Sequence, residues 1–162
     1  MKHQLRAVDS GFVTSAPKVF VFDAGVDAAR DRVFEAIVAD PQRWRAWFPG
    51  ITGGRYAGAA DHGVGATRFL GLAGLRVRET ILVDEPPRRW AYRVDAASIP
   101  IARAVVETWR FEELPDGTYV RWSLAIDPTA LFTLLLPFPQ TTLGAIWRRG
   151  MRNLGADLRE AP

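Results

Sequence analysis

The chain has 162 residues, 48% hydrophobic and 24% charged, and its 21 basic against 18 acidic residues give a formal net charge of +3. This length and composition are typical of one globular domain and exclude an intrinsically disordered, collagen-like or coiled-coil protein. The chain has no cysteine and only two histidines, His3 and His62. Disulfides, thiol catalysis and cysteine zinc sites are therefore excluded, and we expect neither a metal nor a cofactor.

The basic residues do not predict a nucleic-acid partner. All of them except Lys2 and Lys18 are arginines, and they alternate with acidic residues in runs no longer than two. A nucleic-acid groove needs clustering of positive charge on one face. The first residues lack the apolar run of a signal peptide, and the longest apolar stretch, Ala130–Phe138, is far shorter than the roughly 20 residues of a membrane span. We therefore expect a cytoplasmic protein without an integral membrane segment.

The first elements are predicted after an N-terminal lead-in of residues 1–18, which precedes a single domain over residues 19–162. Val19–Ala24 is rich in β-branched and aromatic residues, as strands are. Asp27 then suits the N-cap of a helix that ends before Pro41. A second short helix is expected over Gln42–Phe48.

From Ile51 onward, apolar residues recur with a period of two, which indicates strands. Short turns between the strands favour an antiparallel meander. The expected strands are Ile51–Tyr56, Ala66–Leu72, Leu75–Asp84, Arg89–Asp95, Ala102–Leu114 and Thr118–Asp127. A long helix is then predicted over Gln140–Arg159, with its apolar residues on one face.

Four segments carry a resemblance to a known family. They are Phe22–Ile51, Gly63–Phe69 (GVGATRF), Arg78–Val94 and Pro115–Trp122. Their order and spacing resemble the START-like or SRPBCC superfamily (helix-grip, Bet v 1-like), and most of all its polyketide cyclase/dehydrase and lipid transport branch. The resemblance implies an α+β helix-grip fold, in which a curved antiparallel sheet wraps around the long C-terminal helix. It also implies an internal apolar cavity, in which members bind lipids, polyketides, hormones or quinones.

Pairing the strands through their turns predicts which side chains point inward. The turn at Ala73-Gly74 places Arg68 opposite Glu79, and the turn after Glu85 places Val83 opposite Trp90. The inward side of the sheet is consistently apolar, as one buried face requires. It also carries four polar residues, Arg68, Glu79, Tyr92 and Glu107.

Three interpretations of these polar residues are open. An ion pair between Arg68 and Glu79 can tie two strands together, since either charge buried alone would be costly. The group can instead orient a polar part of a ligand inside an apolar pocket. Glu107 and Tyr92 are also candidate catalytic residues, because buried carboxyl groups gain pKa values suited to proton transfer. The aromatic residues expected around such a ligand are Trp90, Trp109, Trp122, Trp47, Phe48 and Trp147.

The expected function is binding of a hydrophobic small molecule, such as a lipid, isoprenoid or polyketide-like ligand, by a carrier or sensor. One alternative is an enzyme of the polyketide cyclase, aromatase or dehydratase type that uses the same cavity. A second alternative is a cochaperone-like protein-interaction module. Trp47, Phe48 and the stretch Leu131–Phe138 are candidates for an apolar entrance that contacts membranes transiently.

Overall fold

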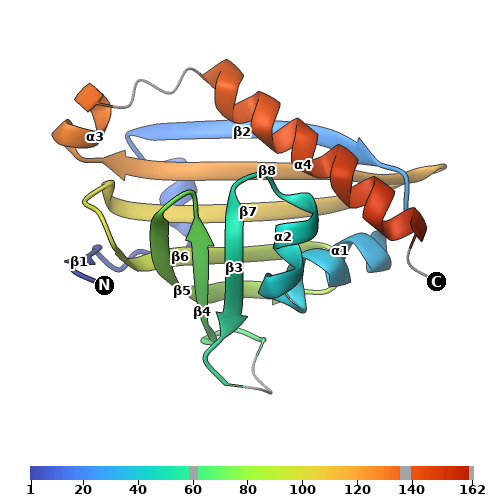
Figure 1. Cartoon of the computed structure of the whole chain (residues 1–162), viewed down its shortest axis with the longest axis horizontal. Coiled ribbons are helices and arrows are strands. Elements are labelled where there is room, and N and C mark those ends of the chain that lie inside the picture. Colours follow the sequence, from blue (N-terminus) through green and yellow to red (C-terminus); the bar gives the residue numbers. More distant parts are fainter. Residues whose placement is uncertain (59–61, 136–139, 161–162) are drawn as a thin grey trace.

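The computed structural model describes residues 1–58, 62–135 and 140–160. Its main feature is a curved, eight-stranded antiparallel sheet (Figure 1). Seven strands follow the order β2-β8-β7-β6-β5-β4-β3, and the short β1 pairs with β6 beside them. The strands are β1 (His3–Gln4), β2 (Lys18–Val26), β3 (Ile51–Tyr56), β4 (Thr67–Leu72), β5 (Leu75–Glu85), β6 (Arg89–Ala97), β7 (Ala102–Leu114) and β8 (Gly117–Pro128).

The helices are α1 (Arg30–Val38), α2 (Trp44–Trp47), α3 (Ala130–Leu135) and α4 (Gln140–Glu160), with two 3-10 helices, η1 (Ser10–Thr14) and η2 (Pro41–Arg43). All of them except η1, which lies on the outer face, and α3 cover the inner face of the sheet. The long α4 crosses in front of β2 and β8, and α3 lies at one end of the sheet (Figure 1). The buried side of α4 is apolar and includes Trp147, Met151 and Leu154. The core therefore lies between the sheet and α4, as the helix-grip fold requires.

Most of the predicted elements are confirmed, with bounds that differ by one or two residues. The N-cap is an exception, because α1 begins at Arg30 after Ala29 rather than after Asp27. Strand β2 continues to Val26, which pairs with Thr118 of β8, and this pairing delays the start of the helix. Asp27 instead forms an ion pair with Arg159 of α4 at 3.5 Å.

The predicted register of the inner face is confirmed apart from one position. Arg68 pairs with Glu79 as predicted. Tyr92 pairs with Glu107, a pairing that no tight turn had fixed in advance. Val83 lies opposite Ala91 and not Trp90, because a bulge between Ile81 and Val83 shifts the pairing. Such an irregularity inserts a residue into one strand, and a turn-based alignment does not foresee it.

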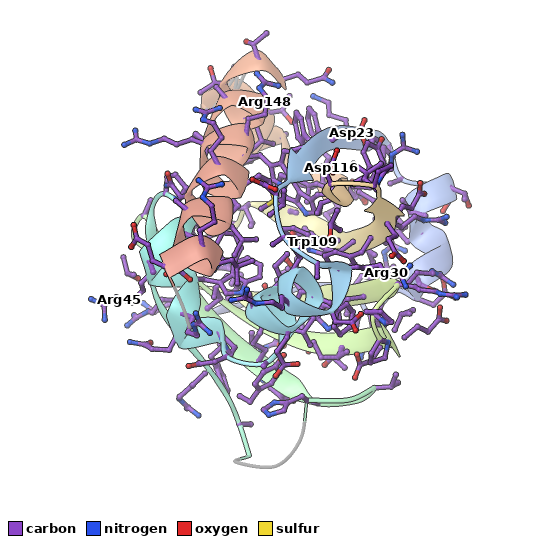
Figure 2. The ribbon with its side chains drawn as sticks, turned by 90° about the vertical axis from the view of Figure 1, so that its right-hand side faces the viewer. Asp23, Arg30, Arg45, Trp109, Asp116 and Arg148 are labelled. Atoms are coloured by element: carbon purple, nitrogen blue, oxygen red, sulfur yellow. The ribbon has the colours of Figure 1, made fainter. Side chains whose placement is uncertain are left out.

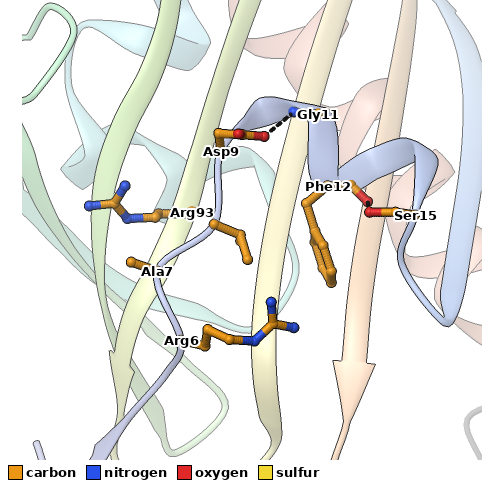
Figure 3. Close-up of a pocket in the computed structure, with 8 residues that line it drawn as sticks. Arg6, Ala7, Asp9, Gly11, Phe12, Ser15 and Arg93 are labelled. Carbon is orange, nitrogen blue, oxygen red and sulfur yellow. Dashed lines mark hydrogen bonds between the residues drawn. The ribbon is translucent and has the colours of Figure 1, made fainter.

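The N-terminal lead-in covers part of the outer face of the sheet. Its Phe12 packs against Ala104, Val106 and Ala125, which form a second, smaller apolar cluster. Between the lead-in and the sheet lies an open hollow of about 680 Å³, lined by Arg6, Phe12, Ser15 and Arg93 among others (Figure 3). The lead-in is therefore packed on the domain, and both faces of the central strands carry apolar contacts.

Candidate functional site

The inner polar residues begin with the pair Arg68–Glu79. Strands β4 and β5 place the two side chains opposite each other, and Arg68 Nε donates to Glu79 Oε2 at 2.6 Å. The side chains of Arg68 and Glu79 are 0% and 2% exposed. Burial raises the pKa of Glu79, and the neighbouring guanidinium opposes this rise. Breaking such a pair leaves one charge buried alone, so each partner needs the other.

Aromatic rings enclose the guanidinium of Arg68. Its Cζ lies 4.8 Å from the ring centroid of Trp44, 4.6 Å from that of Trp90 and 4.3 Å from that of Tyr92. A cation over an aromatic face is attracted by the electrons of the ring. Nη1 and Nη2 have no hydrogen-bond acceptor among the described residues. A ligand would therefore reach Arg68 only by displacing one of these rings.

The second part of the site is built around Glu107 on β7. Tyr92 of β6 donates its hydroxyl proton to Glu107 Oε2 at 2.5 Å, and Trp122 Nε1 of β8 donates to the same oxygen at 2.8 Å. Three neighbouring strands thus supply one hydrogen-bonded triad. The second oxygen, Oε1, receives no hydrogen bond from the residues that the structure describes.

The surroundings of Glu107 suit it to proton exchange near neutral pH. Burial raises its pKa to about 7, repulsion from Glu79 adds to the rise, and the hydrogen bonds from Tyr92 and Trp122 oppose it. Burial also raises the pKa of Tyr92 well above its usual value, so this phenol remains a donor. Glu107 can therefore accept or donate a proton, whereas Tyr92 holds it in place.

Glu107 is also the member of this group that keeps accessible surface. Arg68, Glu79 and Tyr92 are at most 2% exposed, whereas Glu107 is half-buried. Its cross-strand neighbour Leu124 is also half-buried. Phe20 of β2 lies opposite Leu124 and is likewise half-buried. The accessible end of the polar group is thus bordered by apolar side chains, and the Arg68 end is closed.

All the aromatic residues predicted for the site lie in the core. Trp122, Trp147 and Phe22 stack beside the Glu107 end, with centroids 5.6 to 6.4 Å apart. Trp109 joins the two ends, lying 5.9 Å from Trp122 and 5.7 Å from Trp44. Figure 2 shows Trp109 inside the molecule, whereas Arg45 and Arg148 extend away from it.

The expected cavity is not outlined by these aromatic residues, which are closely packed. Two open hollows of the described part of the structure lie elsewhere. One is the outer hollow under the lead-in, and the other lies between the start of α1 and the β7–β8 turn. Neither is lined by Arg68, Glu79, Tyr92 or Glu107.

Trp47 and Phe48 do not lie at a rim. They are 1% and 9% exposed, and α4 covers them, with Asn153 Nδ2 donating to Trp47 O at 3.0 Å. Of the stretch Leu131–Phe138, residues 136–138 lie outside the described part of the chain. Leu131 and Leu134 of α3 are exposed.

Two features of the site were not predicted from the sequence. Trp44 was not among the expected site residues, although its spacing of three from Trp47 places both on one side of a short helix. No role was predicted for His62, and its ring packs on Tyr56 with centroids 4.5 Å apart. Its Nδ1 is buried without a partner among the described residues.

The described residues contain no group of three or more potential ligands placed to hold a metal ion. No helix among them is long and apolar enough to cross a bilayer.

Comparison with known proteins places the chain in a family. Residues 20–159 match the family described as polyketide cyclase / dehydrase and lipid transport. Uncharacterized proteins of Mycobacterium tuberculosis and Mycobacterium bovis are 28% identical to it over 148 residues, which cover 91% of this chain and 88% of theirs.

Solved structures share the fold at low identity. Major latex-like protein 151 from Panax ginseng superposes with a TM-score of 0.69 at 14% identity, over 90% of this chain and 98% of that one. CalU16 from Micromonospora echinospora superposes with a TM-score of 0.61 at 22% identity, over 89% of this chain and 76% of that one. The match over residues 20–159, together with this fold, shows that the chain belongs to the polyketide cyclase/dehydrase and lipid transport family of the START-like (SRPBCC) superfamily.

Proposed function

We propose that the protein binds a hydrophobic small molecule, such as a lipid, isoprenoid or polyketide-like ligand, as a carrier or sensor. The observation that supports this most is Glu107. Two donors fix its Oε2, its Oε1 receives no hydrogen bond from the described residues, and apolar side chains border its accessible end. A small number of polar groups in an apolar site is typical of ligand-binding pockets.

The closed end of the polar group has a different role in this proposal. Arg68 and Glu79 are enclosed by rings and pair with each other, so they fix strands β4 and β5 beneath the site. The ligand occupies the side of Glu107 that faces Leu124 and Phe20. Its polar group bonds to Oε1, and its apolar part contacts Trp122 and Trp147.

Filling the space beside Glu107 tests this location. Leu124→Trp places a larger side chain next to Glu107, and Val21→Trp is the control, because Val21 is 42% exposed. The probe is anilinonaphthalene sulfonate, whose fluorescence rises on apolar contact; it is excited directly, because both variants add a tryptophan. We expect binding to wild type and to Val21→Trp, and roughly tenfold weaker binding to Leu124→Trp, about the effect of losing one well-buried contact group. Equal binding to all three proteins would place the probe elsewhere.

A second candidate function is an enzyme of the polyketide cyclase or dehydratase type. The pKa of about 7 at Glu107 supports it, because a group that titrates near the working pH serves as both acid and base. Glu107→Gln keeps the acceptor for Tyr92 and Trp122 but removes the proton exchange. Turnover that falls strongly in Glu107→Gln would support this role, turnover that survives would mean that Glu107 is not the acid–base residue, and a wild type without turnover would leave only the binding function.

A further inference from the structure

One end of the molecule carries apolar side chains on its surface. Leu134 of α3 is 79% exposed, Leu131 is 51% exposed and Ile99 of the β6–β7 connection is 46% exposed. Phe132, between the two leucines, is instead packed against the core. The helix thus buries the side of Phe132 and turns the leucines outward. Single exposed leucines are common on protein surfaces, so their position matters only together with the features around them.

Hydrogen bonds hold these apolar residues together at one end of the sheet. Thr129, just before α3, donates its Oγ1 proton to Pro100 O at 2.7 Å and its backbone N–H to Ile101 O at 3.2 Å. The start of α3 and the β6–β7 connection are therefore fixed to each other. Figure 1 shows α3, β1 and this connection at the same end of the molecule.

Positive charge surrounds the same end. Both lysines of the chain are there: Lys2 precedes β1, and Lys18 opens β2 opposite Ile126 of β8. Arg76 lies beside Ser98, the residue before Ile99. The backbone oxygen of Arg76 accepts a hydrogen bond from the backbone N–H of Ser98. Lys2, Lys18 and Arg76 are exposed and form no ion pair with any described residue. The nearby carboxylate of Asp127 is already held by Arg6 and Arg103 at 3.5 and 3.1 Å.

We propose that this surface, the α3 face, docks on an anionic lipid bilayer, and we define it by Ile99, Leu131, Leu134, Lys2, Lys18 and Arg76. Apolar side chains that enter the interface, ringed by basic groups, are the combination that binds peripheral proteins to anionic membranes. A second copy of the chain is a poorer occupant, because two such faces would bring unpaired lysines together. The inference goes beyond the proposed function, since docking needs no bound ligand.

Vesicle flotation tests the proposal on the full chain. The vesicles are phosphatidylcholine alone and an equal mixture of phosphatidylcholine and phosphatidylglycerol. We expect wild type to float with the mixed vesicles, to float much less with phosphatidylcholine alone, and to be released as salt is raised. Leu131→Asn/Leu134→Asn should weaken binding roughly tenfold or more, because two leucines lose their place in the interface.

Matched controls lie at the far end of β7. Leu114→Asn replaces a leucine that is 44% exposed there and should bind as wild type does. Lys18→Glu and Arg110→Glu change the net charge equally, and only Lys18→Glu should weaken binding. Wild type that fails to float overturns the proposal, as does a leucine double variant that binds as well as Leu114→Asn. A wild-type dimer that the leucine double variant abolishes also overturns it, because a second copy then covers the face.

Discussion

Glu107 is held by two donors deep in the fold and still keeps accessible surface. The donors Tyr92 and Trp122 come from the strands on either side of β7. Burial is nevertheless the largest cause of its raised pKa. The residue thus combines a fixed orientation with a proton that exchanges near neutral pH. Ligand binding needs the first property, and acid–base chemistry needs the second.

The raised pKa of Glu107 makes stability depend on pH. The usual value of 4.5 applies to the unfolded chain, and the folded value is about 7. Between these values the folded form keeps the proton that the unfolded form has lost. The unfolding free energy should therefore fall as pH rises through this window, by about 3 kcal/mol in all. Above the folded pKa this contribution levels off.

Urea unfolding at both ends of the pH window measures this effect. Over this window the unfolding free energy of Glu107→Gln should fall by about 3 kcal/mol less than that of wild type. Glu79, whose pKa is also raised, contributes to the fall in both proteins. Glu112→Gln is the control, because Glu112 is exposed on the same strand, and it should follow wild type. A Glu107→Gln protein with the pH dependence of wild type would mean that Glu107 does not titrate there.

The pairing of Arg68 with Glu79 was predictable at this scale, but the accessibility of the site residues was not. Cross-strand register follows from tight turns and alternation, so Arg68–Glu79 could be placed from the sequence. The connection between β6 and β7 is not a tight turn, so the Tyr92–Glu107 pairing did not follow in the same way. That Arg68 is closed in by Trp44 depends on how α2 packs onto the sheet. No local pattern contains that information.

At the scale of elements, the fit of α4 on the sheet depends on its glycines. A Cβ at Gly144 would lie 2.9 Å from Phe22 Cε1, closer than side chains tolerate. Phe22 is 6% exposed and stacks on Trp122 and Trp147, so its ring has little room to move. A Cβ at Gly155 would meet its nearest neighbour, Val26, at an ordinary 3.7 Å.

The two glycines should therefore respond oppositely to alanine. Gly155→Ala gains helix propensity without a clash and should stabilise the protein by ~0.5–1 kcal/mol. Gly144→Ala makes the same gain but pushes α4 away from β2, and should destabilise it by roughly 1–3 kcal/mol. Thermal unfolding of both variants measures the difference. If Gly144→Ala proves as stable as Gly155→Ala, α4 does not press on Phe22 as described.

The elements also show where local patterns were insufficient. Alternation and turn residues predicted the meander well, because each strand pairs with its neighbour in sequence. Asp27 was a good candidate N-cap, yet the pairing of Val26 with Thr118, far along the chain, decided the helix start. Short α3 was not predicted at all, and its first turn is stabilised by Thr129 Oγ1, which accepts from Phe132 N–H at 3.1 Å.

At the scale of the whole molecule, two surfaces have separate proposed roles. The inner face between β7, β8 and α4 carries Glu107 and is the proposed site of the hydrophobic ligand. The α3 face carries exposed leucines and lysines that form no ion pair within the described part of the chain, and its proposed role is to dock on a membrane. Phe132 connects the two, since it is packed against the core while Leu131 and Leu134 on either side of it are exposed.

Native mass spectrometry tests the central claim, the inner ligand site, most directly. Wild type is incubated with a total lipid extract, freed of excess lipid and weighed intact, beside Leu124→Trp and Val21→Trp. The account predicts a retained small molecule, at one mass or a narrow set of masses, on wild type and Val21→Trp and its loss from Leu124→Trp. Wild type that shows only the mass of the bare chain, or three proteins that retain the same molecule equally, would contradict it.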